Sequence, residues 1–128
     1  MKLILIVLFS FFTISAIAAD TNVPIRLAVM PDTDACSSLG IVSGLVSSKL
    51  AVRAGPGKAF IHIDSLANGQ NLYLCGLSKD KKWHSVIYMP NQSTPDCGVS
   101  SPAKSRDAYS GPCKYGWVHS AWLKVIAG

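Results

Sequence analysis

The sequence predicts an all-β domain, a small barrel built from five to seven short strands. Short apolar and β-branched runs recur from residue 40 onward, and turn sequences such as Gly55-Pro56-Gly57 and Asn68-Gly69 separate them. No stretch after residue 19 keeps helical spacing over three turns. Several short strands at regular intervals are typical of small barrels and sandwiches.

The candidate strands alternate between apolar and polar residues, as half-buried strands do. They cover residues 40–46, 49–53, 60–66, 71–77, 83–89, 115–119 and 123–126, and residues 23–30 are a further candidate edge strand. Within 71–77, Leu72 and Leu74 share one face and alternate with Tyr73. Ser120-Ala121-Trp122, before the last strand, is expected to form a short 3₁₀ turn.

The third candidate strand and the turn after it lead to two further expectations. Ile61 and Ile63 share one face of this strand, and His62 lies on the other, so we expect His62 to be exposed. The same argument predicts an exposed His84 in the fifth strand. Asn68-Gly69 predicts a tight hairpin, because Asn-Gly is the preferred sequence of two-residue hairpin turns.

The first 19 residues have the layout of a secretory signal peptide. Lys2 gives the positive charge, residues 3–12 the apolar run, and residues 16–19 the small side chains of a cleavage site. The apolar stretch is shorter than the roughly 20 residues of a membrane-spanning helix. We therefore expect cleavage of residues 1–19, a periplasmic or secreted protein, and no stable membrane insertion. The remaining chain has the length of one domain, and we expect a monomer.

The composition narrows the classes of partner and of chemistry. The formal net charge of +5 favours anionic partners such as the cell wall or an acidic protein. The lysines are scattered rather than gathered in a stripe, so we expect no nucleic-acid binding. The absence of glutamate argues against the paired carboxylates of a glycosidase.

All four cysteines, Cys36, Cys75, Cys97 and Cys113, follow the signal segment. An even number of cysteines in a short exported chain predicts two disulfides. No pair has the C-x-x-C spacing of zinc sites, and we expect neither a metal nor another cofactor. The residues alone leave all three pairings open.

Three segments resemble the bacterial SH3 (SH3b) family. Leu50–Gly57 (LAVRAGPG) is similar to that family's L-N-V-R-x-G-P-x segment, although Ala51 replaces the usual asparagine. Residues 66–74 resemble its L-x-x-G strand, and residues 115–123 (YGWVHSAWL) its closing G-W-V segment, with Trp83 at the usual tryptophan position. The resemblance implies an SH3-like barrel over residues 39–128, after a lead-in at 20–38.

One departure from that family is a long connection, residues 90–114, where the family has a brief turn. A connection of this length in a compact domain is usually functional or tied down. Cys97 and Cys113 lie inside it, so we prefer the pairing Cys97–Cys113, which leaves Cys36 with Cys75. The second bond would join the lead-in to the barrel.

The resemblance implies a binding module that recognises cell-wall peptide or another peptide-type ligand. Tyr88, Tyr109, His119 and Trp122 are the predicted contact residues, because aromatic rings with a polar edge suit peptide recognition. The two tyrosines have an alternative role, which is to pack the long connection onto the barrel. A second hypothesis is an inhibitor or immunity-type protein that binds another exported protein through residues 90–114.

An enzymatic function would depend on Asp96-Cys97-Gly98, which resembles the nucleophile segment of NlpC/P60 cell-wall peptidases. A catalytic cysteine needs a helix N-terminus or a histidine to lower its pKa. No helix pattern follows Cys97, and the one later histidine, His119, belongs to the barrel motif. We therefore expect a disulfide cysteine and no enzyme.

Overall fold

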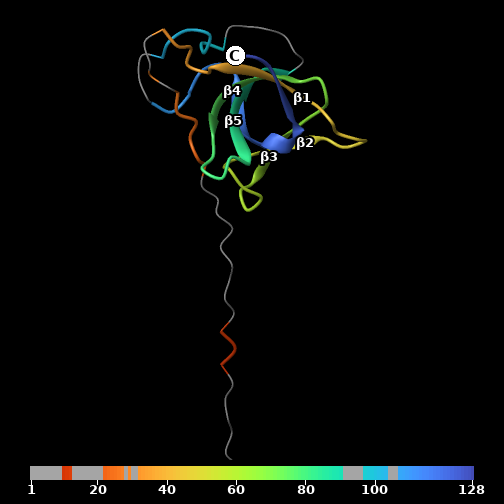
Figure 1. The fold of residues 1–128 in the computed structure, drawn as a ribbon. Helices are drawn as coiled ribbons and strands as arrows, with labels where there is room; N and C mark the ends of the chain where they lie inside the picture. Colours follow the sequence, from red (N-terminus) through yellow and green to blue (C-terminus); the bar gives the residue numbers. More distant parts are fainter. Residues whose placement is uncertain (1–9, 13–21, 28, 30–31, 91–96, 104–106) are drawn as a thin grey trace, which may run out of the picture.

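The computed structural model describes residues 10–12, 22–27, 29, 32–90, 97–103 and 107–128 (Figure 1). Apart from residues 10–12, the expected signal peptide lies outside the described residues, as does Asp96. In the described part of the chain, no helix is long and apolar enough to cross a membrane.

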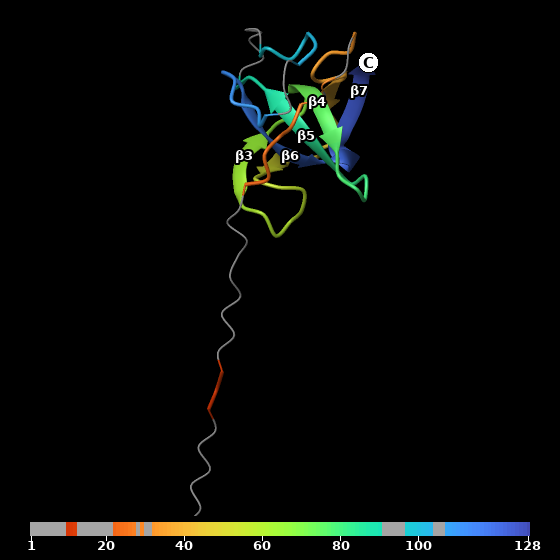
Figure 2. The ribbon, with the colours of Figure 1, turned by 90° about the vertical axis from the view of Figure 1, so that its left-hand side faces the viewer.

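The fold is all-β, as the sequence predicts. Seven strands form one antiparallel sheet in the order β3-β2-β6-β5-β4-β1-β7, which curls around a central core (Figures 1 and 2). The strands are β1 (Ser38–Val42), β2 (Leu50–Arg53), β3 (His62–Leu66), β4 (Asn71–Leu77), β5 (Trp83–Tyr88), β6 (Lys114–His119) and β7 (Leu123–Ala127), and η2 (Ser120–Trp122) is the expected 3₁₀ turn. The barrel is open, because β3 and β7 are the two edges of the sheet.

The Asn68-Gly69 turn is present, but the predicted hairpin is wrong, since β3 and β4 are not neighbours in the sheet. Gly69 has φ +89° and the amide of Gln70 donates to the carbonyl of Ala67, as in a type II turn. Such turns splay the flanking strands, whereas the hairpin turn needs positive φ at both central residues. The amide of Gly69 donates to Val42 at the end of β1, so the turn carries the chain across the barrel instead.

The inner core fills the barrel and follows the predicted alternation. It consists of Val42, Leu50, Val52, Leu66, Leu72, Leu74, Val86, Tyr88 and Val118. The strands β2, β4 and β5 each contribute residues two apart, as side chains on one face of a strand must be. In β3 the alternation starts from the buried Leu66, so Asp64 shares its inner face and Ile63 lies on the outer one, where a register shift between Val52 and Arg53 also leaves it without a partner residue. Ile63 is therefore exposed while Asp64 turns toward the core.

A second, outer core lies on the other face of β4 and β5. Its buried members are Ile25, Ala35, Cys36, Ile87, Cys97, Val99, Tyr109 and Cys113. They come mainly from the lead-in and from the long connection, which lie together outside the ring of strands in Figure 1. The lead-in is not the expected edge strand in the described residues, where only a single bridge joins Arg26 to Ala108. We call these two segments, residues 22–37 and 97–113 as described, the cover.

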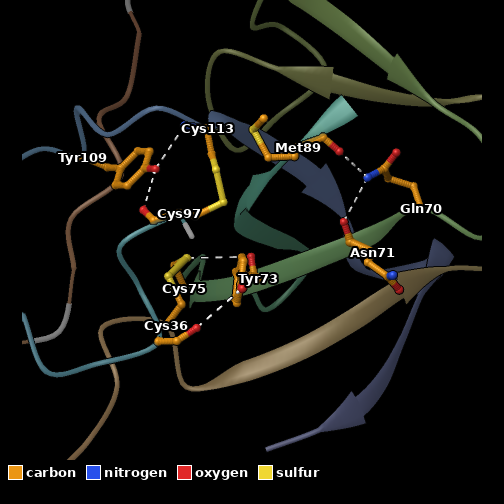
Figure 3. The surroundings of a disulfide bond; sticks show 10 residues. Cys36, Gln70, Asn71, Tyr73, Cys75, Met89, Cys97, Tyr109 and Cys113 are labelled. Atoms are coloured by element: carbon orange, nitrogen blue, oxygen red, sulfur yellow. Dashed lines mark hydrogen bonds between the residues drawn. A yellow bond between two sulfur atoms is a disulfide. The ribbon is translucent and has the colours of Figure 1, made fainter. Parts of the chain in front are cut away.

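Both disulfides have the preferred pairing. Cys36–Cys75 joins the lead-in to β4, and Cys97–Cys113 closes the long connection (Figure 3). Cys75 is the extra residue where the β4–β5 register shifts between Leu74 and Gly76. The cover is thus held by two covalent bonds as well as by apolar packing.

Candidate ligand groove

The outward face of the β5–β6 hairpin runs from the cover to an open groove. Three cross-strand pairs point outward along it: Ile87 with Tyr115, Ser85 with Trp117, and Trp83 with His119. Ile87 lies under the cover, and the indole nitrogen of Trp117 donates to the carbonyl of Val23 in the lead-in at 3.1 Å. The Trp83–His119 pair lies beyond the cover and forms an edge-to-face contact with ring centroids 5.3 Å apart.

The covered end contains Tyr109, one of the predicted contact residues. Its side chain is 7% exposed, and its hydroxyl donates to the carbonyl of Cys97 at 2.9 Å and accepts from the amide of Cys113 at 3.3 Å (Figure 3). Its ring also packs edge-to-face against Tyr115. Tyr109 therefore holds the disulfide-closed loop together and leaves almost no accessible surface for a ligand.

Tyr88, another predicted contact residue, is 2% exposed and belongs to the inner core. Its hydroxyl donates to Asp64 Oδ2 at 2.7 Å, and Lys114 Nζ lies 3.6 Å from the same oxygen. Burial and the carboxylate raise the pKa of Tyr88 far above its usual value. Burial alone would raise the pKa of Asp64, but the bonds from Tyr88 and the amide of Ser65 and the charge of Lys114 together lower it. Neither tyrosine is accessible to a ligand in this structure. Tyr109 packs the long connection onto the sheet, which was the alternative role, whereas Tyr88 fills the inside of the barrel.

The open end is a groove of about 410 Å³ that contains the other two predicted contact residues. It is lined by Leu45, Ser48, Lys49, Leu50, Ala51, Arg53, Lys58, Trp83, His119, Ala121 and Trp122. Trp83 is buried beneath it, whereas Trp122 is 40% exposed. The groove therefore offers apolar and aromatic surface with charged side chains around it.

His119 and Trp122 are positioned by the η2 turn. His119 Nδ1 accepts a hydrogen bond from the amide of Ala121, so the neutral ring carries its proton on Nε2. Ser120 anchors the turn from the other side, because its hydroxyl donates to the carbonyl of Lys81 and lies 2.8 Å from His84 Nδ1. Since the hydroxyl proton is directed at the Lys81 carbonyl, His84 is the donor in this second bond.

His84 is half-buried rather than exposed as expected, because it points inward from β5 toward the end of the barrel. Burial lowers its pKa, since the low-dielectric surroundings disfavour the charged ring. The bond from its Nδ1–H to Ser120 supports the η2 turn. His62, the other histidine expected on an exposed face, is exposed as predicted.

Arg53 is the groove residue that sequence reasoning missed. It points outward from β2, opposite Trp117 on β6. Its Nη1 donates to the carbonyls of Lys58 at 3.3 Å and Phe60 at 3.0 Å, both in the loop after β2. That loop turns tightly at Gly55, where a Cβ would overlap the Phe60 ring. Alternation with the buried Leu50 and Val52 was the available signal that Arg53 faces outward.

The described residues contain no free thiol and no cluster of metal-ligating side chains. Cys97 is bonded to Cys113 and has no free thiol. Within the described residues, no three His, Cys, Asp or Glu side chains come together as metal ligands do.

No protein-family model, curated protein or solved structure matches this chain.

Proposed function

We propose that this protein is an exported SH3b-like binding module that takes a peptide-type ligand, cell-wall peptide in the first place, in the groove beside Trp122. The observation that carries the proposal is the meeting of His119 and Trp122 in one open groove over the buried ring of Trp83. A half-exposed indole above an apolar floor provides flat contact area at low conformational cost, as peptide sites do.

Export is supported by two features. Residues 1–19 have the layout of a signal peptide, and both disulfides pin segments that are otherwise irregular. Disulfides persist in oxidising compartments such as the periplasm or the cell exterior. The resemblance of the Leu50–Gly57 and Tyr115–Leu123 segments to the SH3b family supports the choice of cell-wall peptide among peptide ligands.

The alternative proposal is an inhibitor or immunity-type protein that binds another exported protein through residues 90–114. The described parts of this connection, residues 97–103 and 107–113, contribute Cys97, Val99 and Tyr109 to the outer core. These side chains face the sheet and are not available to a partner. Residues 91–96 and 104–106 lie outside the described residues.

Sedimentation with insoluble peptidoglycan tests the leading proposal. The purified protein is mixed with peptidoglycan at low and at raised salt, and the pelleted fraction is measured over a range of protein concentrations. We expect saturable binding that weakens with salt, since charged side chains surround the groove. Failure to pellet at both salt concentrations would refute the cell-wall version of the proposal.

A further inference from the structure

The groove has a one-sided charge. Three of its lining residues are cationic, namely Lys49, Arg53 and Lys58, and none of its described lining residues is acidic. None of the three forms an ion pair with a described residue, whereas Lys114, outside the groove, pairs with Asp64. Like charges gathered at a concave surface focus the electrostatic potential and attract an oppositely charged ligand.

The guanidinium of Arg53 is held in one orientation and has an edge available for an anion. Its Nη1 donates to two loop carbonyls, those of Lys58 and Phe60, which fixes the guanidinium. No described residue bonds its Nε or Nη2 atoms. These two nitrogens form one edge of the guanidinium, and such an edge matches the two oxygens of a carboxylate.

The surroundings favour a peptide carboxylate over other anions. The indole of Trp122 and the apolar side chains of Leu45 and Ala121 line the same groove, so the ligand places an apolar part beside its charge. A peptide chain combines the two, because a side-chain or terminal carboxylate follows directly from a backbone that stacks on aromatic surface.

We propose that the groove recognises a carboxylate of its peptide ligand and that Arg53 is the residue that binds it. This inference rests on the proposed function and adds the chemical class of the ligand. Side-chain and C-terminal carboxylates share the required chemistry, and short peptides that carry one or the other separate them.

Peptidoglycan with amidated carboxyl groups is the first probe. We expect untreated peptidoglycan to pellet the protein and the amidated material to pellet it at least tenfold more weakly, on the scale of a lost charged hydrogen-bond pair. Equal binding to both materials would overturn the carboxylate inference and leave the proposed function standing. Failure of the untreated material would instead refute the cell-wall proposal.

Variants of Arg53 test whether this residue binds the carboxylate. R53Q removes the charge, and we expect roughly tenfold to hundredfold weaker binding. R53K keeps the charge without the planar fork, and we expect an intermediate loss. K79Q removes one positive charge from a turn outside the groove and is the matched control, with a change below about twofold. Equally weak binding by R53Q and K79Q would overturn the assignment, because only the net charge would then matter. Unfolding midpoints check that each variant folds.

Three short peptides decide the source of the carboxylate without the cell wall. Acetyl-Ala-Glu-Ala-amide carries only a side-chain carboxylate, acetyl-Ala-Gln-Ala only a terminal one, and acetyl-Ala-Gln-Ala-amide neither. Tryptophan fluorescence follows each titration, because Trp122 lines the groove. We expect the uncharged peptide to bind at least tenfold more weakly than the better of the charged ones. No preference for a charged peptide, or no response to any of the three, would overturn the inference.

Discussion

The two ends of the β5–β6 hairpin have different surroundings although they belong to one ladder. At one end, Ile87 is buried under a cover that two disulfides and Tyr109 hold in place. At the other end, the Trp83–His119 pair borders an open groove with cationic side chains. The covered end resembles a second core, and the open end resembles a binding site.

We expect this difference to separate the residues that stabilise the fold from those that bind the proposed ligand. Substitutions under the cover should lower the free energy of unfolding and leave ligand binding intact in the folded protein. Substitutions in the groove should weaken ligand binding and change the free energy of unfolding less. Variants of the two regions test this separation, from the largest expected effect to the smallest.

Removal of the disulfides should have the largest effect. C36A/C75A opens a loop with a sequence separation of 39, and C97A/C113A one of 16. The chain-entropy model gives losses of about 4 and about 3 kcal/mol in the free energy of unfolding. Urea unfolding measures both. A loss below about 1 kcal/mol for either pair would mean that apolar packing alone holds that part of the cover.

Truncation of Ile87 tests whether the outer cluster is a true core. Ile87 and its neighbour Val86 are both fully buried, one under the cover and one inside the barrel. We expect I87A to lower the free energy of unfolding by about 3 kcal/mol and V86A by about 2 kcal/mol, from lost transfer energy and a residual cavity. If I87A left the free energy of unfolding nearly unchanged while V86A lowered it, the cover would not pack as a core against the sheet.

Loss of the Tyr109 hydroxyl should have a moderate effect. Y109F leaves the carbonyl of Cys97 and the amide of Cys113 without their shared partner. Each is a buried polar group, so we expect the free energy of unfolding to fall by about 1 to 2 kcal/mol. Y115F is the control, because Tyr115 is exposed and its ring contact with Tyr109 needs no hydroxyl. Equal effects of the two variants would contradict the role given to Tyr109.

The Asp64 carboxylate should stabilise the fold in a pH-dependent way. Its pKa is lowered in the folded protein, so its contribution is complete above the unfolded pKa of about 3.9 and is lost as the pH falls through the folded value. Solvent screens this partly exposed group, and we expect D64N to lower the free energy of unfolding by about 1 kcal/mol at pH 7. Urea unfolding from about pH 7 to about pH 2 should show the difference between D64N and wild type vanish at the acid end; a constant difference would contradict the linkage.

The regular strands could be predicted from the sequence, and much of the rest could not. Alternation indicated which of Leu72, Tyr73 and Leu74 face the barrel. The turn at Asn68-Gly69 misled because its type depends on bonds to β1, far away in the sequence. The outer core has no periodic signal, since most of its members lie in irregular segments joined by disulfides.

The candidate site could be predicted only in part, because local sequence patterns do not show tertiary pairing or burial. His119 and Trp122 lie close together in one motif, and η2 brings both to the groove. Arg53 reaches the groove from β2 through a tertiary pairing with Trp117, which no local pattern shows. The chemistry of Tyr88 and Tyr109 suits a contact residue, but the packing of the fold buries both side chains.

Peptidoglycan sedimentation of W122A beside Y109F tests the central claim most directly. W122A removes the exposed indole of the groove, and Y109F weakens the cover. We expect W122A to be somewhat less stable than wild type but folded, as its unfolding midpoint checks, and to remain in the supernatant because the groove loses its exposed indole. Y109F, less stable but folded, should pellet as wild type does, and so should the exposed-leucine control L77A. Normal pelleting of W122A together with loss of Y109F from the pellet would contradict the account and place recognition in the cover.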